Sequence, residues 1–160
     1  MSKHKHLGAI VVVSGILITV FATFFFVFLP YVMTPSVSLS LGLGVFDSMM
    51  AVNDTERSKG LSGVTELAAD KALIMVFPAE SKWKIWMNGM KMPIDIIWLD
   101  QNKTVIYIVK NALPDASGSK SFEPKKLAKY VIEVPAGTVD NVKIKINQVA
   151  NFQYNETNVR

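Results

Sequence analysis

A long apolar run near the N-terminus, from Leu7 to Leu29, holds no charged residue. About 20 apolar residues cross a bilayer as a helix, whereas a cleaved signal peptide has an apolar core of roughly 7–15 residues. The residues that follow, Pro30 to Thr34, contain no small-residue cleavage pattern. The pattern predicts a retained transmembrane signal anchor at residues 7–29 in the lipid bilayer, with cleavage after Pro35 as the alternative.

Charges on the two sides of this run predict its orientation. Lys3 and Lys5 lie in a basic head, residues 1–6, and the flank after the run has no Lys or Arg before Arg57. The positive-inside rule then predicts a single-pass cell-membrane protein with a cytoplasmic N-terminus and an extracytoplasmic domain. Residues 30–36 include two prolines and are interpreted as a short, stiff linker.

Beyond the linker, apolar and polar residues alternate with a period of two, which is typical of strands with one buried face. Strands are predicted at residues 37–41, 45–52, 73–77, 84–87, 94–99, 104–109, 129–134, 142–146 and 148–154. Asp54 or Thr55 can cap a helix that ends at Gly60, and shorter helical turns are predicted at residues 67–71 and 138–141. This predicts a mainly β domain at residues 37–154, a small barrel or closed antiparallel sheet with two or three short helices, before a polar tail at residues 155–160.

Composition removes several classes of function. The chain has no cysteine, and both histidines, His4 and His6, lie in the head. Thiolate catalysis, disulfides and His-based triads or metal sites are therefore excluded from the domain. The formal charge of +4 includes Lys3 and Lys5, so the domain lacks the clustered basic surface of a nucleic-acid binder. We expect no cofactor and no nucleic-acid partner.

The segment at residues 85–100 contains the most unusual residues of the domain. Asn88–Gly89 is a tight-turn dipeptide, and Pro93 lacks an N–H and suits the start of a strand. Met87, Met90 and Met92 have the thioether groups that soft metals prefer, but no Cys or His accompanies them. Flexible core filling explains these methionines better than a metal does.

Several motifs follow one another in a recognisable order. They are an Arg-x-x-Gly-Leu helix, a Phe-Pro after a strand, a Trp-Met to Pro-Ile-Asp-Ile segment, and a segment that reads YVIEVPAG. The residues concerned are Arg57, Gly60, Leu61, Phe77, Pro78, Trp86, Met87, Gly89, Met90, Pro93, Ile94, Asp95, Ile96 and Tyr130 to Gly137. Between about Val45 and Phe152 the chain thus resembles the domain of unknown function 192 family of bacteria and archaea. The resemblance implies a mainly β, barrel-like fold and no particular activity, because the family is uncharacterised.

The chain departs from this family pattern at three positions. Ile85 stands in place of an aromatic residue, Asn88 in place of a Lys, and Val64 in place of an Arg. If those basic residues bind an anionic ligand in the family, part of that binding is lost here.

Asp95 is the candidate catalytic residue, and six residues are candidates for ligand binding. The six are Arg57, Trp86, Met87, Met90, Asp95 and Glu133. A carboxyl buried among Trp and Ile side chains has a perturbed pKa, which is a property of acid–base catalysts. The alternative is a structural aspartate that accepts backbone N–H bonds or pairs with Arg57.

Two main hypotheses follow. The favoured one is an anchored extracytoplasmic binding or accessory module that recognises an envelope glycan or a membrane protein around Trp86, Met90 and Asp95. The alternative is a hydrolase-like enzyme on envelope glycans, with Asp95 as acid or base. A third hypothesis is a structural partner of another membrane protein.

Overall fold

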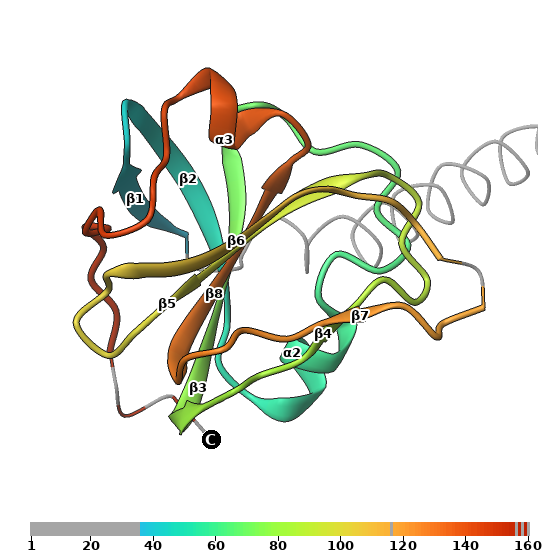
Figure 1. Cartoon of the computed structure of the whole chain (residues 1–160), viewed down its shortest axis with the longest axis horizontal. Coiled ribbons are helices and arrows are strands. Elements are labelled where there is room, and N and C mark those ends of the chain that lie inside the picture. The colour runs from blue at the N-terminus through green and yellow to red at the C-terminus, as the bar shows by residue number, and fades with distance from the viewer. Residues whose placement is uncertain (1–35, 116, 156, 158, 160) are drawn as a thin grey trace, which may run out of the picture. The chain divides into compact units, whose positions relative to one another are not determined.

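A six-stranded mixed sheet, in the order β1-β2-β3-β8-β5-β6, is the framework of the domain (Figure 1). The computed structural model describes residues 36–115, 117–155, 157 and 159. The strands of this sheet are β1 (Val37–Leu41), β2 (Gly44–Ala51), β3 (Lys71–Ser81), β5 (Ile94–Leu99), β6 (Val105–Ala112) and β8 (Ala128–Pro135). A second sheet pairs β4 (Ile85–Trp86) with β7 (Ser121–Phe122), and the described helices are α2 (Asp54–Lys59) and α3 (Thr138–Asn141). The domain is mainly β, as the alternation predicted.

The predicted head, the anchor at Leu7–Leu29 and the linker up to Pro35 lie outside the described residues. Within the described part of the chain, no helix is long and apolar enough to cross a membrane. The anchor and its orientation therefore stay predictions from the sequence.

The prediction of a barrel or closed antiparallel sheet is wrong. β2 and β3 pair in parallel, because the chain returns through α2 and residues 60–70 before β3 begins. In the described chain β1 and β6 are the two edges of the six-stranded sheet. Two isolated bridges, Ser40 to Asn151 and Thr104 to Val149, connect the C-terminal segment to those edges, and the amide of Asn147 donates to the carbonyl of Val105 at 2.9 Å.

The C-terminal segment differs from its predicted form for a local reason. Residues 142–146 alternate between apolar and polar side chains, yet Lys143 has a φ of 60° and Asn147 a φ of 70°. Positive φ values break an extended backbone, and the amide of Lys143 instead donates to the carbonyl of Asp140 at 3.4 Å. The predicted strands at residues 142–146 and 148–154 are therefore turns and isolated bridges.

The sheet has a hydrophobic core on each face. One core contains Ile132 and Val134 of β8, together with side chains of β1, β2 and the C-terminal segment. The opposite core contains Val131 of β8, with Leu73 and Met75 of β3 and the three methionines of residues 87–92. Successive strand residues point to opposite faces, so the residue between Ile132 and Val134, Glu133, points into the second core.

Candidate functional site

A pocket of about 220 Å³ lies on the second face of the sheet. Helix α2 and the turn after it, through Ser62, form one side, and residues 83–86 with Met90 form another. Met75 and Phe77 of β3 and Glu133 of β8 complete its lining. A pocket whose walls are mostly apolar and which contains a few polar groups is the usual form of a ligand site.

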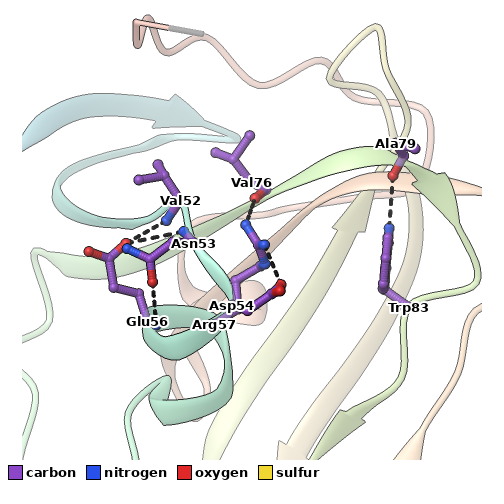
Figure 2. A network of polar contacts seen from close by, with 8 residues as sticks. All are labelled: Val52, Asn53, Asp54, Glu56, Arg57, Val76, Ala79 and Trp83. Atoms are coloured by element: carbon purple, nitrogen blue, oxygen red, sulfur yellow. Dashed lines mark hydrogen bonds and ion pairs between the residues drawn. The ribbon is translucent and has the colours of Figure 1, made fainter. Parts of the chain in front are cut away.

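A capping box sets the start of helix α2 (Figure 2). The amide of Glu56 donates to the side-chain oxygen of Asn53 at 2.9 Å, and Glu56 Oε2 accepts the amide of Asn53 at 3.3 Å. The same oxygen accepts the amide of Val52 at 2.7 Å. The N-cap is thus Asn53 and not the predicted Asp54 or Thr55, and these bonds fix the helix that borders the pocket.

Arg57 lines the pocket and joins α2 to β3 through the hydrogen bond to Val76 that Figure 2 shows. Its side chain is buried, with Nη1 donating to the carbonyl of Val76 at 2.7 Å and Nη2 pairing with Asp54 at 2.6 Å. The guanidinium also lies 5.3 Å from the centre of the Phe77 ring. These contacts give Arg57 a positioning role in addition to its place in the lining.

Aromatic side chains form the wall opposite the helix. Trp83 stacks on Phe77 with ring centres 4.2 Å apart and 14° between the planes. Its indole N–H donates to the carbonyl of Ala79 at 3.0 Å (Figure 2), and its carbonyl accepts the indole N–H of Trp98 at 2.9 Å. Trp86 lines the same pocket but is 54% exposed, so its ring offers an apolar surface at the edge.

Glu133 supplies the buried polar group of the pocket. It is 3% exposed, and its Oε2 has no hydrogen-bond partner among the described residues. A Cβ on Gly60 would lie 3.6 Å from that oxygen and 3.0 Å from the end of Met75, so glycine permits this close approach. Burial raises the pKa of Glu133 to about 7, although a hydrogen bond from the Leu61 amide acts in the opposite direction.

Asp95 lies on the other face of the sheet and does not line the pocket. It pairs with Val134 in the ladder between β5 and β8, while its neighbour Ile96 pairs with Glu133. Its two carboxylate oxygens accept the amides of Asn111 at 2.8 Å and Val139 at 2.9 Å. This geometry matches the structural alternative for Asp95, through backbone amides and not through Arg57.

The structure brings together four of the six predicted ligand-binding residues. Arg57, Trp86, Met90 and Glu133 line the pocket, whereas Met87 is fully buried in the core and Asp95 lies behind the sheet. The sequence-based set did not include Gly60, Leu61, Phe77, Trp83, Lys59 and Lys84, which also line it. Two of the motifs, Arg-x-x-Gly-Leu and Phe-Pro, contain some of these residues and were the available signal.

The titratable groups of the pocket limit its chemistry. Asp54, the other carboxylate in the lining, has a side chain that is 95% exposed and is paired with Arg57. Within the described part of the chain, no three His, Cys, Asp or Glu residues are grouped to hold a metal ion. The lining therefore has one buried carboxyl, an apolar wall and cationic residues from α2 and residue 84.

Sequence comparison identifies relatives in archaea. The UPF0127 protein TK1120 of Thermococcus kodakarensis is 33% identical over 92 residues, which cover 56% of this chain and 54% of that protein. A UPF0127 protein of Pyrococcus abyssi is 35% identical over 77 residues, or 47% of this chain and 62% of the relative. The chain thus spans about half to three-fifths of the length of these relatives.

Solved structures share the fold at low sequence identity. A protein of unknown function from Novosphingobium aromaticivorans has a TM-score of 0.65 and 24% identity, with 72% of this chain and 83% of that chain covered. A Sinorhizobium meliloti protein, described as a candidate transcription regulator, has a TM-score of 0.67 and 22% identity, with 73% and 92% covered. The model of the family described as "Uncharacterized ACR, COG1430" matches residues 39–152. The chain therefore belongs to this family, DUF192.

Proposed function

We propose that the protein is a membrane-anchored binding module that presents its β domain to a component of the cell envelope. The observation that carries the proposal is the pocket that ends on the buried carboxyl of Glu133. The uncharged run at Leu7–Leu29, preceded by Lys3 and Lys5, supports the anchor and an extracytoplasmic domain. The partner is an envelope glycan or a membrane protein, part of which enters the pocket.

Binding accounts for this site better than hydrolysis does. Glycoside hydrolysis ordinarily uses two carboxyl groups on either side of the scissile bond. Asp95, the residue on which a hydrolase was hypothesised, lies on the opposite face of the sheet from Glu133. Asp54 is exposed and paired with Arg57, so Glu133 has no second carboxyl in a comparable buried position within the pocket.

Blocking the pocket is expected to abolish recognition of the envelope. Ser58 is exposed on α2 and lines the pocket, so Ser58→Trp fills the entrance without changing the core. We expect the affinity of the full chain for isolated envelope polysaccharide, measured by co-sedimentation, to fall at least about tenfold. Thr55→Trp is the matched control, because Thr55 is exposed on the same helix but outside the pocket. Equal binding by the two variants would contradict the proposal.

A second measurement tests the predicted membrane anchor. Protein extracted from membranes with detergent is expected to retain residues 7–29 when its N-terminus is read by mass spectrometry. A mature protein that begins after Pro35 would show that the segment is cleaved and the domain released.

A further inference from the structure

The dimensions and charges of the pocket indicate which class of ligand it binds. This inference rests on the proposed binding function. We infer that the pocket binds an acidic sugar unit, with its ring hydroxyls at Glu133 and its carboxylate at the basic rim. Such a unit is a six-membered sugar ring that carries a carboxylate. Four features of the pocket support this ligand class: its volume, its buried carboxyl, its cationic residues and its exposed aromatic ring.

The volume fits one ring of a larger molecule. The pocket measures about 220 Å³, which is below the roughly 300–1,000 Å³ of sites that enclose a whole small molecule. A single sugar ring is compact enough for this space, and the rest of a polymer would continue across the exposed edge at Trp86. An indole that is 54% exposed provides an apolar surface for the C–H face of a ring.

The buried end of the pocket requires a hydrogen-bonding partner from the ligand. Glu133 Oε2 is buried and has no partner among the described residues, and such groups are costly when left unpaired. A hydroxyl both donates and accepts, so it bonds to a carboxylate and to a protonated carboxyl alike. An ammonium group would bond well only to the ionised carboxylate, and a ligand carboxylate only to the protonated carboxyl.

The charged residues around Glu133 favour an anionic ligand. The pocket's other charged residues are Asp54, Arg57, Lys59 and Lys84. Asp54 and Arg57 pair with each other, so the uncompensated charge comes mainly from the two lysines. Lys59 forms no ion pair with a described residue, and Lys84 lies 3.4 Å from Glu123 in a solvent-exposed pair that is weak. Positive charge at the rim attracts a sugar carboxylate and repels an amino sugar.

The pH dependence of binding follows from the same arrangement. Glu133 becomes ionised as the pH rises through its raised pKa, about 7. An ionised Glu133 repels the ligand's carboxylate while its bond to a ring hydroxyl persists. The acidic sugar therefore binds more tightly on the acidic side of neutrality, and a neutral sugar shows little change.

The test uses the full chain in detergent micelles and three trisaccharides, of galacturonic acid, glucose and glucosamine, titrated by calorimetry. We expect the acidic trisaccharide to bind at least about tenfold more tightly than the neutral one, and the amino sugar to bind most weakly. The affinity for the acidic trisaccharide is expected to fall about threefold between about pH 6 and about pH 8 in the wild type, and to stay constant in Glu133→Gln.

Point variants separate the parts of the site. Lys59→Gln is expected to reduce the affinity for the acidic trisaccharide about threefold and to leave the neutral one unchanged. Lys126→Gln removes the same charge from an exposed position outside the pocket and is expected to change neither. Trp86→Ala is expected to weaken both sugars about fivefold.

The outcomes distinguish this inference from the binding function itself. Equal or tighter binding of the neutral or amino sugar would overturn the inference and leave the binding module in place. Failure of all three sugars would also overturn it, and the Ser58→Trp experiment on envelope polysaccharide would then decide whether the module binds the envelope at all.

Discussion

Asp95→Ala is expected to lower the free energy of unfolding by about 3–5 kcal/mol, because it leaves one buried and one partly buried amide without an acceptor. The carboxylate is fully buried and accepts the amides of Asn111 at 2.8 Å and Val139 at 2.9 Å. It thereby joins the start of β5 to the end of β6 and to the first turn of α3. Urea unfolding of the full chain in detergent, followed by tryptophan fluorescence, measures the change.

Two further variants make this result specific. Asp140→Ala removes a carboxylate from the same helix, but Asp140 is exposed and, among the described residues, its ion-pair partner is Lys110, so a loss below about 1 kcal/mol is expected. Asp95→Asn keeps one acceptor oxygen and turns an NH₂ group toward the other amide, so an intermediate loss is expected. A loss below about 1 kcal/mol in Asp95→Ala would contradict the structural role. Envelope binding retained by folded Asp95→Asn would support the binding module over the hydrolase.

Asp95 illustrates what the sequence could and could not predict. Its place after Pro93, at the start of an apolar strand, marks it as unusual, and that much is local information. Its role depends on amides 16 and 44 positions further along the chain. Its distance from the pocket depends on strand register, because Asp95 pairs with Val134 and points away from Glu133. Neither the partners nor the register can be obtained from the spacing of residues within one segment.

The difference between local and long-range contacts also explains which parts of the fold could be predicted from the sequence. The hairpin of β1 and β2 and the pair of β5 and β6 connect strands that are close in sequence, with turn residues between them. The parallel pair of β2 and β3 forms across the α2 connection, and that long-range pairing is the reason the closed antiparallel sheet was wrong. The two-residue strand β4 lies within the predicted strand at residues 84–87. Its partner β7 was not predicted, because two residues are too short for a period of two to be recognised.

Only part of the site could be predicted, because its residues lie in local motifs whereas its walls form through tertiary contacts. Motif residues such as Arg57, Trp86 and Glu133 could be named individually, because each lies in a recognisable local pattern. Glu133 acquires its raised pKa only when α2 and the turn after it cover the second face of the sheet. Trp83 and Phe77 form one wall because their rings stack, with ring centres 4.2 Å apart. Burial and contact of this kind depend on tertiary packing.

Glu133→Gln is expected to stabilise the protein at alkaline pH and to have little effect at acidic pH. The pKa of Glu133 is about 7 in the folded protein against 4.5 for an ordinary glutamate. Between these values the unfolded chain loses the proton and the folded protein keeps it, so wild-type stability falls as the pH rises. The full difference, about 3 kcal/mol, is reached above about pH 8, where Glu133 is ionised in both states.

Gln is a suitable replacement because its side-chain oxygen can still accept the Leu61 amide, while its uncharged NH₂ group takes the place of Oε2. The quantity to measure is the difference in unfolding free energy between the variant and the wild type, from urea titrations at about pH 5 to about pH 9. Titration of the other carboxyls largely cancels in this difference. Glu66→Gln, at an exposed position outside the pocket, is the charge-matched control and should give a small difference at every pH. If the difference for Glu133→Gln stays constant across this range, the folded protein ionises Glu133 like an exposed glutamate. The buried carboxyl would then not be the group that links ligand binding to pH.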